Sequence, residues 1–156
     1  HEYNSRADMD IISMRIPVVY GPGGRMGARG TNLIATEGAI NGAVTLPFGP
    51  AERVIIGHVQ DVAEAVVRLL LTEQLQHKHY NVGGHTLSFR DIADIGCSII
   101  PGLRVDYAAD TDAIELPYLI DNTRIVEELG IVHRPPAPAY RELAALTRAQ
   151  AGMSPL

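Results

Sequence analysis

The sequence predicts an α/β or mixed α+β domain, and three features of the chain lead to this prediction. Short β-branched runs alternate with segments of helical periodicity. Glycine and proline, at 15 and 10 residues, separate most of these segments. The length of 156 residues falls within the roughly 100–200 residues of a single domain. One hydrophobic core is therefore expected.

The first half of the chain is expected to contain three strands and a long helix. Residues 10–16 form a short apolar run with β-branched content, bounded by Pro17, which predicts a buried strand. Arg15, in the middle of this strand, is expected to pair with a buried carboxylate. Apolar residues on one face of the helix recur at i, i+3 and i+4, namely Val59, Val62, Ala63, Val66, Val67, Leu70 and Leu71. The expected elements are strands at 10–16, 44–46 and 53–56, a weak helix at 31–40 and the long helix at 59–71.

The second half continues the alternation. Ser88 and Asp91 have capping-box spacing ahead of an apolar-periodic stretch. The single cysteine, Cys97, lies in that stretch and is expected to be a buried thiol. Asn122 is expected to cap a short helix that ends at Gly130. The expected elements are a strand at 79–82, a helix from about residue 89, a strand at 103–107 and helices at 122–129 and 139–151.

Composition excludes some partners. No apolar run approaches the roughly 18 residues of a membrane span, so no membrane partner is expected. The net charge is −5 and the basic residues are scattered, which argues against nucleic acid. A lone cysteine favours a cytoplasmic protein. The opening residues 1–6 do not resemble a secretory signal, and we expect the chain to begin at a cut point.

A glycine-rich segment, 24–30, fits G-x-x-G-x-x-G but is not expected to be a dinucleotide loop. In such a loop the first glycine ends the strand directly, whereas residues 17–23 intervene here. No clean second strand with a terminal acid follows. A compact nucleotide-binding domain built on 24–30 remains a third alternative for the function.

Four segments, in order, resemble the extended short-chain dehydrogenase/reductase family, which includes NAD-dependent epimerases and dehydratases. The resemblance implies the last strands of a Rossmann-like parallel sheet plus a small mixed α+β substrate-binding domain. Residues 1–156 would be a single C-terminal, substrate-side portion, with the N-terminal cofactor-binding half absent. The segments are Met14-Arg-Ile-Pro-Val-Val-Tyr-Gly-Pro22, His58-Val-Gln-Asp-Val-Ala63, Tyr80-Asn-Val-Gly-Gly84, and Asp121-Asn-Thr-Arg124 with Glu128-Leu-Gly130.

The family's catalytic Tyr-x-x-x-Lys pair is absent from the sequence. None of the six tyrosines is followed at that spacing by lysine, and the only lysine, Lys78, is preceded by Gln74. In this family the tyrosine acts as acid/base while the cofactor carries the hydride. The resemblance therefore implies that this chain alone is inactive and contains no catalytic residue.

The resemblance also implies binding roles. Pro17, Val18 and Val19 would lie against the nicotinamide end of NAD or NADP, which the missing half would mainly bind. Arg25, Arg53 and His58 are the candidate substrate-binding residues, the arginines because a guanidinium binds phosphate or carboxylate bidentately. His58 is alternatively a helix cap. No metal site is expected, since the histidines at 77, 79 and 85 have no cysteine or acid at ligand spacing.

These observations predict the substrate-binding part of an NAD(P)-dependent epimerase/dehydratase or reductase. Its substrate would be a sugar nucleotide or a small hydroxylated or carbonyl compound. The alternative is a non-catalytic, truncated relative that acts as a binding or regulatory module. The strand at 10–16 would leave a sheet edge and an apolar face exposed, so we expect a homo-oligomer or association with the missing half.

Overall fold

The computed structural model describes residues 11–23, 30–108 and 118–156, and it confirms the α/β prediction. The glycine-rich segment 24–30 lies outside the described residues except for Gly30. In chain order the elements are β1 (Ser13–Arg15), β2 (Val18–Tyr20), α2 (Glu37–Asn41), β3 (Ala43–Leu46), β4 (Arg53–His58), α3 (Val59–Leu71), β5 (His79–Asn81), β6 (His85–Ser88), α4 (Phe89–Ile99), β7 (Arg104–Tyr107), α5 (Thr123–Leu129) and α6 (Pro136–Gln150).

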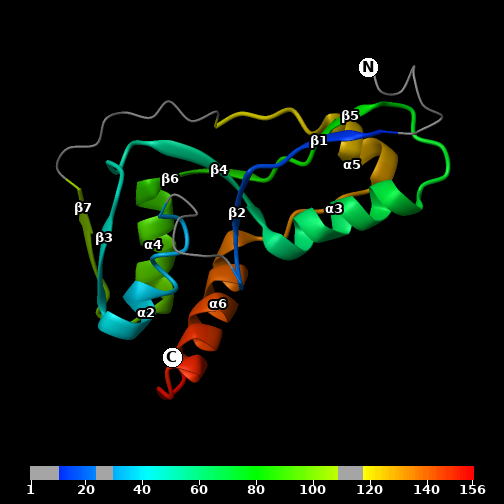
Figure 1. Cartoon of the computed structure of the whole chain (residues 1–156). Helices are drawn as coiled ribbons and strands as arrows, with labels where there is room; N and C mark the ends of the chain where they lie inside the picture. The colour runs from blue at the N-terminus through cyan, green and yellow to red at the C-terminus, as the bar shows by residue number, and fades with distance from the viewer. Residues whose placement is uncertain (1–10, 24–29, 109–117) are drawn as a thin grey trace.

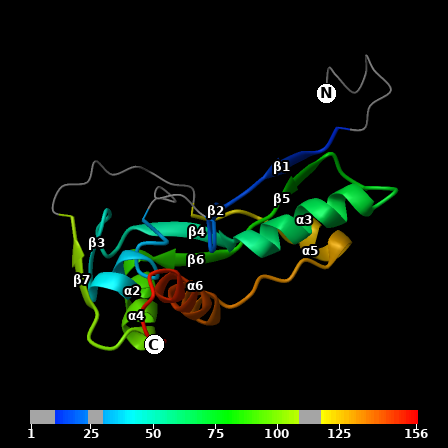
Figure 2. The same ribbon diagram turned by 60° about the horizontal axis from the view of Figure 1, so that its bottom comes forward.

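The strands form three small sheets. β1 pairs with β5 and β3 with β7, both in parallel. Between these pairs lies the sheet β2-β4-β6, in which β2 is parallel and β6 antiparallel to β4. Figures 1 and 2 show β1, β5, α3 and α5 together at one end and α2, α4, β3 and β7 at the other. The chain passes from the first sheet to the central one at Ile16 and Pro17.

Two hydrophobic clusters stabilise the two ends of the molecule, where the sequence predicted one core. The larger packs α2, α4 and α6 around β2, β3 and β4, with Tyr20, Phe89 and Tyr140 among its fully buried side chains. The smaller packs the inner face of α3 against β5 and α5. Its members are Ala65, Leu69, Tyr80, Val82, Ile125, Leu129 and Ile131.

Local signals at helix ends are confirmed. Helix α3 has the predicted bounds. The Ser88 hydroxyl accepts a hydrogen bond from the Asp91 amide at 3.1 Å, and the Asp91 carboxylate accepts one from the Ser88 amide at 2.7 Å, which completes the capping box. Gly130 ends α5 with φ of 63°, a left-handed conformation that glycine adopts without a Cβ clash.

Several predictions of burial and capping are wrong. Cys97 is exposed, because the core-facing side of α4 is formed by its neighbours Phe89, Ala93 and Gly96. The first strand covers only 13–15 in the described residues, and Arg15 is exposed, so it does not pair with a buried carboxylate. The side chain of Asn122 does not cap α5; Asp121 instead accepts from the Thr123 amide at 2.9 Å.

The apolar face that the sequence indicates on α3 is largely exposed. Asp61, Ala65 and Leu69 point inward, whereas Leu70 and Leu71 are 78% and 77% exposed. β5 and α5 contact the inner face of α3, and the apolar residues that the sequence indicated lie to one side of that face. Among the helices of the described residues, none has the combination of length and apolar character needed to cross a membrane.

Candidate functional site

The predicted cofactor segment, Pro17 to Val19, leads into and forms most of β2. Val18 and Val19 are half-buried and pair in parallel with Ile56 and Gly57 of β4. Pro17 is buried over Gly57, where an added Cβ would lie 2.5 Å from the proline Cγ. In the described part of the chain β2 pairs with β4 alone, so its outer edge is a strip of backbone donors and acceptors.

Gly21 follows β2 directly, and its position is fixed by hydrogen bonds and close packing. Its φ of 120° strongly favours glycine. The Gly21 amide donates to the Asn32 Oδ1 at 3.1 Å, and the Asn32 Nδ2 donates to the Gly21 carbonyl at 3.4 Å. An added Cβ would lie 2.8 Å from the Nε2 of His58. The carboxyl end of β2 therefore has a fixed, closely packed path beside the start of α3.

His58, predicted to bind substrate or to cap the helix, is the N-cap of α3. It is 2% exposed, and its Nδ1 accepts from the Gln60 amide at 3.3 Å. The ring also contacts Tyr20 edge-on, with centroids 5.2 Å apart. Burial, followed by the positive charge of Arg134, lowers the pKa of His58. A neutral imidazole is the form that accepts the Gln60 hydrogen bond.

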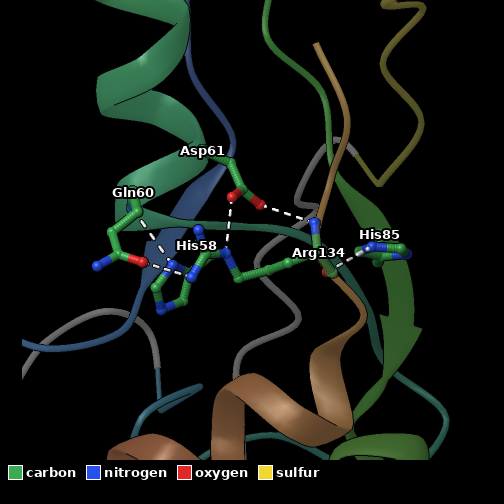
Figure 3. Close-up of polar contacts among 5 residues, drawn as sticks. All are labelled: His58, Gln60, Asp61, His85 and Arg134. Atoms are coloured by element: carbon green, nitrogen blue, oxygen red, sulfur yellow. Dashed lines mark hydrogen bonds and ion pairs between the residues drawn. The ribbon is translucent and has the colours of Figure 1, made fainter.

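The strongest polar contacts of this region join residues that sequence reasoning did not connect. Asp61 is 3% exposed, and its carboxylate accepts from the Arg134 Nε at 2.7 Å and from the Arg134 amide at 3.0 Å. The Arg134 guanidinium also donates to the Gln60 side chain, and the Arg134 carbonyl contacts the His85 Nε2 at 3.0 Å (Figure 3). Arg134 therefore ties the segment entering α6 to the start of α3.

Arg53 lies at the opposite end of β4 from His58. Its side chain is exposed, with the guanidinium 5.3 Å from the ring centroid of Tyr118, a cation–π arrangement. Side chains alternate along a strand, so Arg53 shares a face with Gly57, where Pro17 packs, and not with His58. The structure thus brings Arg53 and Pro17 to one face and separates His58 from them. Arg25 lies outside the described residues.

The described residues fit only part of a dinucleotide. The open edge of β2 offers backbone groups to a carboxamide such as that of nicotinamide. The N-terminus of α3, the helix that follows β4, is already capped by His58 and carries the Asp61 carboxylate in its first turn, so it is not arranged for a pyrophosphate. In the described ranges, no group of three or more histidine, cysteine or acidic side chains is arranged to hold a metal ion.

Folding stability is expected to fall as the pH drops from 7.5 to 5.5. Burial is the main cause that lowers the pKa of both His58 and His133 in the folded chain. Below about 6.5, the ordinary histidine pKa, the unfolded chain therefore binds more protons than the folded one, which favours unfolding. Urea titrations at the two pH values measure the loss.

Replacing His58 measures how much of this pH dependence of stability comes from that one histidine. In His58→Asn the asparagine still caps α3 but does not titrate, so the difference in unfolding free energy between the two pH values should be smaller than in the unsubstituted chain. An unchanged difference would show that His58 does not contribute. His133→Asn tests the second histidine in the same way.

The sequence matches the model of the NAD dependent epimerase/dehydratase family over residues 1–83. No curated protein matches it. Among solved structures, L-threonine dehydrogenase from Phytophthora infestans has a TM-score of 0.82 at 19% identity, covering 96% of this chain and 52% of that one. UDP-glucuronic acid 4-epimerase from Bacillus cereus, in complex with UDP-glucuronic acid and NAD, has a TM-score of 0.78 at 18% identity, with 97% and 49% covered.

A third similar structure is an NAD-dependent NDP-hexosamine 5,6-dehydratase involved in tunicamycin biosynthesis, with a TM-score of 0.76 at 20% identity. The matched region covers 96% of this chain and 50% of the dehydratase. These similarities confirm the predicted Rossmann-like fold. This chain spans about half the length of each of the three structures.

Proposed function

This chain belongs to the NAD dependent epimerase/dehydratase family, and we propose that it is the substrate-side part of an NAD(P)-dependent epimerase, dehydratase or reductase. The observation that carries the proposal is the family match over 1–83, which includes the β2 segment and the start of α3. In this proposal NAD or NADP, when bound, supplies the hydride chemistry. The open edge of β2 positions the nicotinamide end.

A sugar nucleotide is the substrate class that we favour. The side chain of Arg53 is exposed at the start of β4, where its guanidinium would bind the diphosphate of such a ligand bidentately. A small hydroxylated or carbonyl compound has no diphosphate for this contact.

The residues of this chain would bind and orient the substrate and the nicotinamide end of the cofactor. Residues outside this chain would make the proton transfer. The sequence contains no Tyr-x-x-x-Lys pair, so we propose that the chain alone is inactive. The same absence supports the alternative proposal, a non-catalytic relative that binds a nucleotide as a regulatory module. Both proposals use Arg53, and they differ in whether a catalytic half accompanies this one.

The mass of the native polypeptide separates the two proposals. Immunopurified from its source, a catalytic protein should be about twice the 16.8 kDa of this chain, as the half-length coverage suggests, and should bind NAD or NADP. A native mass of 16.8 kDa without cofactor binding would reject the catalytic proposal and favour the binding module.

Arg53→Ala is expected to weaken binding of UDP-glucuronic acid at least about tenfold, because a bidentate charge-assisted contact is worth about 1.5–3 kcal/mol. Binding is measured by calorimetry on the native-length protein. Arg124→Ala, an exposed arginine on α5, is the matched control and should leave the affinity unchanged. Equal effects of the two substitutions would show that Arg53 acts only through net charge and would reject its proposed role.

A further inference from the structure

Two connections between the ends of the molecule meet at Asn122, the residue before α5. One is the turn from β5 to β6, where an added Cβ on Gly83 would lie 2.6 Å from the Asn122 side chain. The other is the segment 131–135, which leads from α5 to α6 and whose His133 Nε2 lies 3.1 Å from the Asn122 Nδ2. One amide side chain therefore joins two of the connections between the smaller and the larger hydrophobic cluster.

The hydrogen bond between Asn122 and His133 has a defined direction. The Asn122 Nδ2 also donates to the Val82 carbonyl, at 3.5 Å. Turning the amide would place its oxygen against that carbonyl, so Asn122 is the donor toward His133 as well. The His133 Nε2 is then unprotonated, and the ring proton is on Nδ1. A proton added to Nε2 would set two donors against each other and break the bond.

The charged and titratable groups that face His133 come from β6, from α3 and from its own segment. The ring of His85 contacts it edge-on, with centroids 6.3 Å apart. Asp61 is already paired with Arg134, the residue after His133. Burial is the largest influence on the pKa of His133, which it lowers. His85 lowers this pKa further, whereas Asp61 and the Val82 carbonyl raise it.

The contacts of Asn122 continue to the predicted cofactor segment. Gly57 of β4 lies between Pro17 and Gly83, because an added Cβ there would be 2.5 Å from the proline Cγ and 3.3 Å from the Gly83 carbonyl oxygen. Asn122 in turn packs on Gly83. The hydrogen bond to His133 therefore supports the packing beneath Pro17.

We propose that Asn122 and His133 form a pH-sensitive latch between the two hydrophobic clusters, closed while His133 is neutral and opened when His133 takes up a proton. In the opened state the segment 131–135 leaves Asn122 and the His133 ring reaches water. The packing beneath Pro17 loosens at the same time. The inference concerns the chain itself and does not depend on the proposed substrate.

The tautomer of His133 is the first test of the latch. Nitrogen chemical shifts of the ring, measured by NMR on this chain at pH 7.5, should show the proton on Nδ1. The measurement needs no substitution. A proton on Nε2 would overturn the proposal, because Nε2 could not then accept the hydrogen bond from Asn122.

Amide hydrogen exchange tests the opening. The Arg134 amide, bonded to Asp61, lies in the latch segment, and the Ile100 amide, bonded to the Gly96 carbonyl, lies in the larger cluster. Arg134 should exchange faster than Ile100 relative to intrinsic rates, since a local opening precedes global unfolding. Equal protection of the two amides would mean that the segment opens only with the whole fold, and would overturn the proposal.

The pH dependence of this exchange identifies the titrating group. A histidine in water has a pKa of about 6.5, so the opened state takes up a proton below that pH. From pH 7.5 to 5.5 the Arg134 amide should therefore exchange about fivefold to tenfold faster, after correction for the intrinsic rate.

His133→Gln is the variant that does not titrate. Its side-chain amide can still accept from Asn122, so the acceleration at Arg134 should fall below about twofold. His79→Gln, at an exposed histidine on β5, is the matched control and should keep the full acceleration. Full acceleration in His133→Gln would show that another group opens the segment and would overturn the proposal.

Discussion

Replacing Gly84 by alanine is expected to remove about 3–5 kcal/mol of folding free energy, a large share of the roughly 5–15 kcal/mol by which domains are usually stable. The φ of Gly84 is 156°, and an added Cβ would lie 2.0 Å from the carbonyl oxygen of Ile56 and 2.8 Å from its carbon. Both contacts are with the backbone of β4, so no side-chain rotation relieves them. Overpacking and backbone strain each cost about 1–3 kcal/mol. Urea unfolding followed by circular dichroism measures the loss.

Gly102→Ala is the matched control for this substitution. Its φ is 72°, also unfavourable for alanine, but nothing lies within 4 Å of the added Cβ. The expected cost is therefore the left-handed conformation alone, about 1–2 kcal/mol. If the two variants lost the same stability, the close approach of residue 84 to β4 would not be the cause.

Much of the local structure could be predicted because its causes are local. Helix α3 was predicted from apolar spacing, and the Ser88–Asp91 capping box from two residues three positions apart. Strand β6 was missed, since His85 to Ser88 contains little β-branched sequence and is held mainly by pairing with β4. That pairing depends on a strand about 30 positions earlier, which no local pattern indicates.

The candidate site, too, could be predicted from the sequence only in part. Arg53 and Pro17 were identified from the resemblance, and the structure places them on one face of β4, whereas the sequence alone did not separate His58 from them. The ion pair of Asp61 with Arg134 joins positions 73 residues apart. In the sequence Asp61 was identified only as part of the family-like segment 58–63, because its partner Arg134 can be found only in three dimensions.

Asp61→Ala is expected to lower the free energy of unfolding by about 2–3 kcal/mol. The substitution leaves the Arg134 guanidinium without its carboxylate and the Arg134 amide without its acceptor. Hydrogen bonds to charged groups contribute about 1.5–3 kcal/mol, and breaking a fully buried pair costs about 3–5 kcal/mol. The Asp61 side chain is 4% exposed but that of Arg134 is 32% exposed, so water compensates for part of the loss. Urea unfolding measures the difference.

Glu64→Ala provides the comparison on the same helix. Glu64 pairs with Arg68 one turn away, but both side chains are more than 40% exposed, so the expected loss is less than about 0.5 kcal/mol. The double variant Asp61→Ala with Arg134→Ala should lose less stability than the sum of its two single variants, because the second substitution removes the unpaired charge left by the first. An additive result, or a loss in Asp61→Ala no larger than in Glu64→Ala, would mean that the segment entering α6 is held to α3 by packing alone.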